Sequence, residues 1–127
     1  MKIEFLDNDA PECPLLRIYD FDALAASRLR DALDTLSKKK GRSVEIHELP
    51  DTVGVGGCQI TAISGDLDTG VLKTAKGRNA FQWILKPTTW DNVVGLIEPF
   101  CGLESKGFQW LDRIGKIAVL ISHRGTW

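Results

Sequence analysis

Long apolar runs are absent from this 127-residue sequence, and none approaches the roughly 18 to 20 residues that a membrane-spanning helix needs. The opening residues, 1–6, contain no apolar core of the kind found in signal peptides. Cysteine is also scarce. Cys13, Cys58 and Cys101 are widely spaced and odd in number, unlike the dense, even sets of secreted disulfide scaffolds. We therefore expect a cytoplasmic protein with three free thiols and no membrane association.

An excess of charge of either sign is missing as well, because 16 Lys and Arg residues face 17 Asp and Glu residues. Nucleic-acid binding depends on a surplus of basic residues, so a nucleic-acid partner is not expected. Basic residues do gather at 38–42 and at 73–78. Phe81 and Trp83, near the second group, alternate as the inward face of a strand, so we interpret both groups as solvated ends of elements.

Complete catalytic, nucleotide-binding and metal-binding motifs are also lacking. Zinc sites usually contain a close pair such as Cys-x-x-Cys or His-x-x-x-His. The sequence contains neither, so no metal and no cofactor is expected. The segment Gly54-Val55-Gly56-Gly57 resembles a phosphate-binding turn, but Gln59 stands where the dinucleotide fingerprint has its third Gly, and a strand follows instead of a helix. We interpret this loop as a flexible connection.

What is present is a globular composition, 43% hydrophobic and 26% charged, in a chain of ordinary domain length. No repeat or linker divides it, so we expect residues 1–127 to form a single α+β domain. Helical periodicity predicts one helix over residues 22–38, capped by Asp20 or Asp22 and ended near Gly41, and a second helix that starts near Pro87. Their apolar stripes are Ala25, Leu29, Ala32, Leu33 and Leu36 in the first and Trp90, Val93, Val94 and Ile97 in the second.

The remaining elements are predicted to be strands that form a mixed β-sheet. The helix over 22–38 joins two of them, which predicts a βαβ unit with parallel neighbours at 15–19 and 43–49. The three strands between residues 58 and 85 predict an antiparallel meander. An elaborated ferredoxin-like arrangement is one way to combine these units. The predicted strands are residues 2–6, 15–19, 43–49, 58–64, 71–74, 80–85 and 117–121.

The last 21 residues contain two further segments with a structural interpretation. Residues 107–114 fit either a helix or one arm of a hairpin, and we favour the hairpin. Residues 117–121 are apolar at both alternating positions, which is typical of an interior strand covered on both faces. Loops or a second subunit would have to cover the second face.

Tryptophan is abundant, with four residues, and aromatic side chains are common anchors at protein interfaces. Our main hypothesis is therefore a non-enzymatic binding or regulatory domain that acts on another protein, either inhibitor-like or immunity-like, or self-associating as a homodimer. Trp110, Arg124 and Trp127 are the candidate partner-binding residues. Trp127 would either pack back on its own domain or dock on the partner.

The alternative is a small enzyme or ligand-binding protein. Cys58 could act as a thiolate if His47 or His123 lay beside it and lowered the pKa of the thiol. The pocket of such a protein would also include the glycine-rich loop and the turn after the strand at 58–64. The candidate ligand-binding residues are Gly54, Gly56, Gly57, Asp66 and Asp68.

Overall fold

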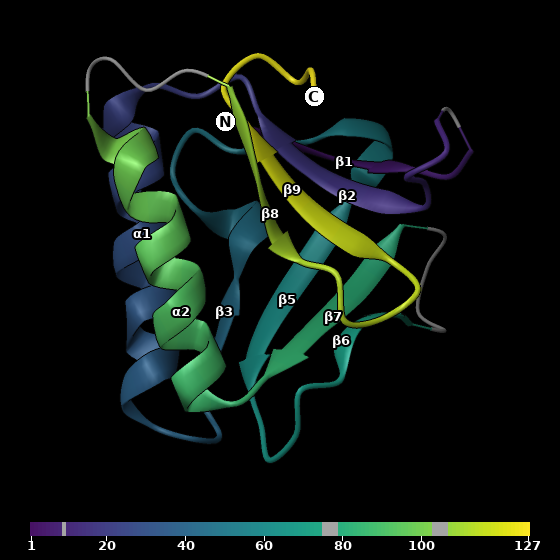
Figure 1. The fold of residues 1–127 in the computed structure, drawn as a ribbon. Coiled ribbons are helices and arrows are strands. Elements are labelled where there is room, and N and C mark those ends of the chain that lie inside the picture. Colours follow the sequence, from purple (N-terminus) through teal and green to yellow (C-terminus); the bar gives the residue numbers. More distant parts are fainter. Residues whose placement is uncertain (9, 75–78, 103–106) are drawn as a thin grey trace.

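The computed structural model describes residues 1–8, 10–74, 79–102 and 107–127 (Figure 1). Its helices are α1 (Ala23–Lys38) and α2 (Pro87–Ile97), with short 3-10 turns η1 (Ile46–Glu48), η2 (Val55–Gly57) and η3 (Glu98–Cys101). Its strands are β1 (Lys2–Leu6), β2 (Leu15–Tyr19), β3 (Ser43–Glu45), β4 (Val53–Gly54), β5 (Gln59–Ser64), β6 (Gly70–Lys73), β7 (Ala80–Leu85), β8 (Phe108–Asp112) and β9 (Ala118–Ser122).

The strands form two mixed sheets, a five-stranded sheet in the order β4-β1-β2-β9-β8 and a four-stranded sheet in the order β3-β5-β7-β6. Two helices with two mixed sheets confirm the predicted α+β class. The prediction of one sheet is wrong, because the chain divides its strands between two. The ferredoxin-like arrangement is not confirmed.

Helix α1 begins where the sequence predicts, because Asp22 Oδ1 accepts a hydrogen bond from the Ala25 backbone N–H at 2.8 Å. The predicted stripe faces the core at Ala25, Leu29, Leu33 and Leu36, although Ala26 is buried in place of Ala32. In α2, Pro87 lies in the first turn, and Trp90, Val93 and Ile97 are buried. Neither helix combines the length and the apolar character needed to cross a bilayer.

The predicted βαβ unit is wrong. Helix α1 does connect β2 to β3, but the two strands belong to different sheets. The parallel neighbour of β2 is β9, with Ile18 opposite Ile121. Strand β3 pairs antiparallel with β5 and stops at Glu45, where η1 replaces the rest of the predicted strand. The physical reason is burial. Ser43 and Glu45 are exposed, as expected of an edge strand, whereas all five residues of β9 are buried and need neighbours on both sides.

The predicted antiparallel meander is also wrong. Strand β7 lies between β5 and β6, parallel to β5 and antiparallel to β6. The core face of β7, formed by Phe81, Trp83 and Leu85, is fully covered, which favours the central position. Strand β6 has Val71 buried but Leu72 and Lys73 exposed, and it takes the edge.

The hairpin interpretation of residues 107–114 and the interior position of the last strand are both confirmed. Strand β8 pairs antiparallel with β9, with Trp110 opposite Leu120. Strand β9 lies between β2 and β8, and each of its residues is buried.

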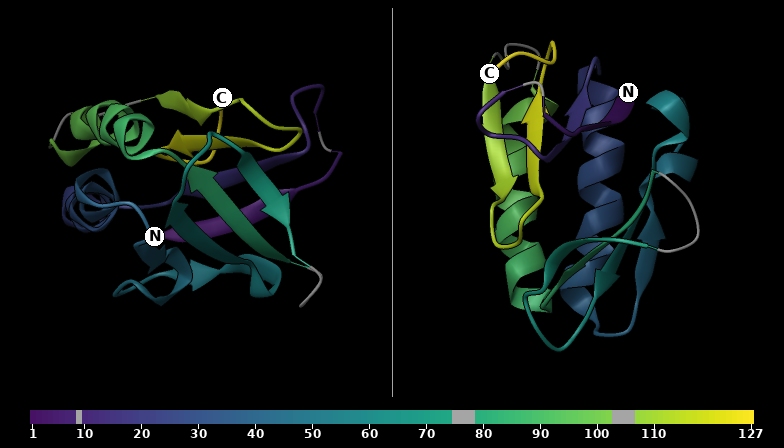
Figure 2. Two further views of the ribbon diagram at one scale, coloured as in Figure 1. Left: turned by 90° about the horizontal axis from the view of Figure 1, so that it is seen from below. Right: turned by 90° about the vertical axis from the view of Figure 1, so that its right-hand side faces the viewer.

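The larger of two hydrophobic clusters lies between the inner faces of the two sheets, and both helices pack against it. Figure 2 shows the sheets diverging from each other and the helices side by side on the open side between them. A buried hydrogen bond joins the sheets, because Trp83 Nε1 of β7 donates to Asp112 Oδ2 of β8 at 2.7 Å. Each sheet therefore has one face on this core and one outer face, and the candidate sites lie on the outer faces.

Candidate functional site

The glycine-rich loop is a compact turn whose glycines have conformational roles. A Cβ on Gly54 would lie 2.1 Å from the Cys58 carbonyl oxygen, so no other residue fits there without a rearrangement. Gly56 and Gly57 have φ angles of 63° and 76°, which favour glycine. The Asn79 side-chain amide donates to the Gly56 carbonyl oxygen at 2.8 Å and fixes the turn. Chain geometry is thus sufficient to explain these glycines.

The two aspartates after β5 make structural contacts. Asp66 forms an exposed ion pair with Lys40, with 2.7 Å between Oδ1 and Nζ. Asp68 Oδ1 accepts a hydrogen bond from the Lys86 backbone N–H at 2.9 Å, directly before α2. This hydrogen bond lowers the pKa of Asp68. Asp68 therefore anchors the start of α2.

Cys58 and the two histidines do not form a thiolate–imidazole pair within the described residues. Cys58 is only 1% exposed, and burial raises the pKa of its thiol to about 12. His47 lies in η1 beside β5, whereas His123 follows β9 in the other sheet and packs edge-on against Phe21. A reactive thiol needs a lowered pKa, which is the opposite of what this environment produces.

The outer face of the five-stranded sheet is covered at one end by the chain itself. A small hydrophobic cluster, called here the apolar cover, occupies this end of the face, where Leu6 lies opposite Leu15 and Leu15 lies opposite Ala118. It covers the second face of β9, and Trp127 packs back on its own domain. The apolar cover consists of Leu6, Leu15, Ala118 and Leu120 with the partly buried Cys13, Trp110 and Trp127.

The polar end of the same face holds the C-terminal segment in place through Arg17. Arg17 Nη1 donates to the Gly125 carbonyl oxygen at 2.8 Å, Nη2 pairs with the Glu4 carboxylate, and the guanidinium stacks 4.0 Å from the centre of the Tyr19 ring. Gly125 is required at this point because its φ is 86° and a Cβ would lie 2.9 Å from Tyr19. Ser122 Oγ closes the turn by accepting from the Gly125 N–H at 3.1 Å.

An aromatic groove of about 660 Å³ opens beside the apolar cover. Phe108 is 47% exposed, and the Arg113 guanidinium lies 4.6 Å from the centre of the Trp110 ring. Of the three partner-binding residues predicted from the sequence, Trp110 and Trp127 line the groove, while Arg124 is exposed next to Gly125, which also lines it. We define the aromatic groove by its lining residues: Ala10, Glu12, Phe108, Trp110, Arg113, Gly125, Thr126 and Trp127.

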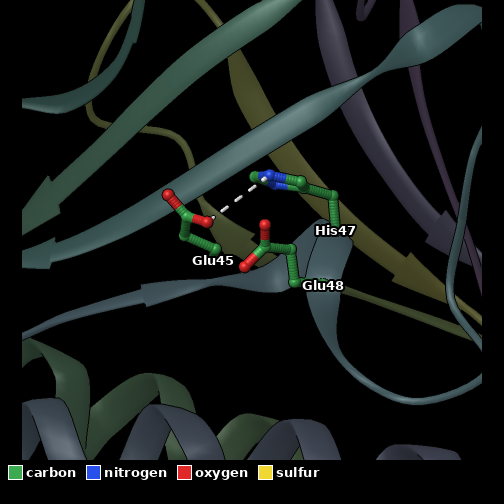
Figure 3. Close-up of side chains that lie close together, drawn as sticks. All are labelled: Glu45, His47 and Glu48. Carbon is green, nitrogen blue, oxygen red and sulfur yellow. Dashed lines mark ion pairs between the residues drawn. The ribbon is translucent and has the colours of Figure 1, made fainter.

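A second hollow, called here the polar cleft, has a volume of about 600 Å³ and lies against the four-stranded sheet. Its lining includes Glu45, His47, Thr61, Lys73 and Gln82. At one end, Glu45 and His47 approach each other, with 3.9 Å between Oε2 and Nε2, and Glu48 points toward the same spot (Figure 3). Carboxylates and an imidazole in this arrangement could hold a metal ion.

Sequence reasoning missed part of both sites. No sequence pattern identifies three residues of the aromatic groove, Glu12, Phe108 and Arg113, as parts of a site. They come together through the hairpin and the returning C-terminal segment. Glu45 and Glu48 stand next to His47 in the sequence and could have been noticed as a local carboxylate–imidazole set. The basic group at 73–78 lies mostly outside the described residues, because residues 75–78 are not described.

Comparison with known proteins adds no assignment, since no family model, no curated protein and no solved structure matches the chain.

Proposed function

We propose that this chain is a non-enzymatic binding domain that holds a segment of another protein in the aromatic groove. The observation that carries the proposal is the groove itself, in which Phe108, Trp110, Trp127 and Arg113 surround a recess of about 660 Å³. Tryptophan and arginine contribute the largest share of the binding energy at many protein interfaces. Binding of this kind suits an inhibitor-like or immunity-like role, in which one protein occupies part of another.

The size of the groove favours a short segment over a second copy of the chain. Eight of the described residues line it, whereas a stable interface between globular surfaces involves about 20 to 30 residues on each side. A segment that inserts one large apolar side chain needs much less surface. The second face of β9, which could have required another subunit, is already covered by the apolar cover. We therefore expect a monomer in solution.

The chemistry of the segment follows from Arg113. The Arg113 guanidinium is exposed and lies 4.6 Å from the centre of the Trp110 ring, and an arginine can bind a carboxylate through two parallel hydrogen bonds. Arg124, exposed beside the groove, adds a second positive charge. We infer a partner segment in which a large apolar side chain stands close to an Asp or Glu. The balanced charge of the chain supports a protein partner over nucleic acid.

The thiol chemistry considered from the sequence is not part of this proposal, because Cys58 is buried and its pKa is raised to about 12. We retain the cytoplasm as the proposed location, since Cys13, Cys58 and Cys101 are all unpaired.

The proposal can be tested by selecting peptides from a random 12-residue display library on the immobilised full chain. Enriched peptides should combine an aromatic or large aliphatic residue with Asp or Glu. Arg113→Glu should weaken the binding of an enriched peptide at least about tenfold, because it replaces attraction with repulsion at an exposed position.

The matched control is Lys38→Glu, a charge reversal at an exposed position on α1. It should leave the affinity unchanged, and melting curves would show that both variants are folded. Enrichment of peptides that bind Arg113→Glu as tightly as the unaltered chain would contradict the proposal, as would the absence of any enriched peptide.

A further inference from the structure

A second site, independent of the aromatic groove, lies at the end of the polar cleft. The ligand-capable atoms of Glu45, His47 and Glu48 all lie within 4.8 Å of one another (Figure 3). Glu45 ends β3, and the other two residues lie in the η1 turn that follows it. The three side chains therefore converge because the strand changes into a 3-10 turn at this point.

The His47 ring is oriented by the backbone of β5. Its Nδ1 lies 3.1 Å from the Ile60 N–H and 3.3 Å from the Ile60 carbonyl oxygen, so the backbone offers a partner to either tautomer. The side chain is only 16% exposed, which restricts rotation of the ring. When Nδ1 carries the proton and donates to the Ile60 carbonyl oxygen, the Nε2 lone pair faces the two carboxylates. Metal-binding histidines are commonly oriented in this way, by a hydrogen bond from the second ring nitrogen to a carbonyl.

The carboxylates of Glu45 and Glu48 lie close to each other, with ligand-capable oxygens within 4.8 Å of one another and of a His47 ring nitrogen. A cation placed between them would offset the repulsion between the two negative charges. Within the described parts of the chain, neither Glu45 nor Glu48 forms an ion pair with Lys or Arg. Lys73 lines the same cleft, but its ammonium lies 5.5 Å from the centre of the Phe5 ring.

We propose that Glu45, His47 and Glu48 bind one divalent transition-metal ion, with Zn²⁺ as the expected ion. An imidazole nitrogen with two carboxylate oxygens is a three-ligand set that Zn²⁺ accepts with water in the fourth position. The imidazole makes Mg²⁺ and Ca²⁺ unsuitable, since both prefer oxygen ligands alone. Glu45 and His47 line the polar cleft, and Thr61 and Gln82 in the same lining offer hydrogen-bonding groups beside the site.

The test is calorimetric titration of the full chain with Zn²⁺, together with absorption spectra of the Co²⁺-loaded protein. We expect one equivalent to bind, at least tenfold more weakly to His47→Asn and to Glu48→Gln, because each variant loses one ligand. Glu98→Gln is the matched control, since Glu98 is an exposed carboxylate that pairs with Arg30 on the helical side of the molecule, and its affinity should be unchanged.

Two features keep the test decisive. Glu48 is exposed, and within the described residues its side chain forms no hydrogen bond to β5, so Glu48→Gln should remain folded even if His47→Asn, which loses the Ile60 hydrogen bond, does not. Co²⁺ bound by Cys13 or Cys101 would show thiolate charge-transfer absorption in the near ultraviolet. Equal Zn²⁺ affinity in Glu48→Gln, a thiolate band, or no binding by the unaltered chain would each overturn the proposal.

Discussion

The outer faces of the two sheets are built in opposite ways. The five-stranded sheet is covered at one end by the apolar cover and held at the other by Arg17, Glu4 and Gly125. The four-stranded sheet carries a row of side chains that runs across its strands from Glu45 through Thr61 and Gln82 to Leu72. No helix lies on this row, because both described helices pack on the core side (Figure 2).

This difference indicates where on the two outer faces a binding site can lie. Most side chains of the covered face pack within the protein, and the aromatic groove at its margin is the surface that we propose for a partner. The uncovered face has fewer packing contacts, and there we propose that the imidazole of His47 and the carboxylates beside it bind a metal ion. The contrast predicts that matched substitutions on the two faces have very different effects.

The largest difference is expected between Leu120 and Gln82. Leu120 is fully buried in the apolar cover, so Leu120→Ala should lower the free energy of unfolding by about 2–5 kcal/mol. Gln82→Ala, at an exposed position of β7, should change it by less than about 0.5 kcal/mol. Urea denaturation of the two variants measures both values. Similar losses in the two would show that the four-stranded sheet is covered as well.

The next largest effect concerns Cys58, which is buried in the hydrophobic core between the two sheets. The folded state keeps the Cys58 thiol protonated up to a pKa of about 12, while the unfolded chain releases the proton near pH 8.5. Stability from this residue is therefore complete below pH 8.5 and declines as the pH rises. Relative to Cys58→Ala, the free energy of unfolding should fall by about 2 kcal/mol between pH 7.5 and pH 10. Parallel curves for the two proteins would contradict the buried thiol.

A smaller difference in stability is expected when one ion pair of each sheet is removed. Arg17 and Glu4 have side chains only 20% and 22% exposed, and Arg17 also binds the Gly125 carbonyl oxygen. Arg17→Ala should cost about 1–2 kcal/mol, because it leaves the Gly125 carbonyl without this donor and the Glu4 carboxylate without its counter-ion, with the Tyr19 hydroxyl as its remaining donor. Lys40→Ala removes the exposed pair with Asp66, beside the four-stranded sheet, and should cost less than about 0.5 kcal/mol. Thermal denaturation at matched ionic strength compares the two variants.

The smallest expected effect is on local opening of the apolar cover. Cys13 and Trp127 are both partly buried residues of this cover. Trp127→Ala should destabilise the closed cover by about 1 kcal/mol and raise the labelling rate of Cys13 about fivefold, as in a local unfolding equilibrium. Cys101, half-buried in η3, serves as the control and should keep its rate. Mass spectrometry of labelled peptides resolves the two sites, and an unchanged Cys13 rate would argue against a cover held by Trp127.

The parts of the fold that the sequence predicts correctly are those decided by neighbouring residues. Asp22 and the stripe through Leu29 and Leu33 specify α1, because a cap and a helical period are local properties. The apolar residues on both faces of β9 likewise identify an interior strand. Which strands become neighbours in a sheet is not decided by neighbouring residues. The parallel partner of β2 is about 100 residues away in the chain, and alternation alone does not identify it.

The candidate sites follow the same division. Trp110 and Trp127 could be selected from residue type alone, because exposed or terminal tryptophan is unusual. Phe108 and Arg113 could not, since their role depends on the hairpin that places them beside the C-terminal segment. Glu45 and Glu48 are close to His47 in the sequence, but on a regular strand Glu48 would point away from Glu45, and η1 reverses that expectation.

The proposed binding function is tested most directly by the indole N–H resonances of the four tryptophans, recorded while a peptide selected on the full chain is added. Trp83 and Trp90 bond to Asp112 and to the Ile63 carbonyl oxygen in the interior, so their resonances should stay in place. The resonances of Trp110 and Trp127 should shift in proportion to peptide bound. A peptide that binds while both of these resonances remain still would contradict the assignment of the aromatic groove as the binding site.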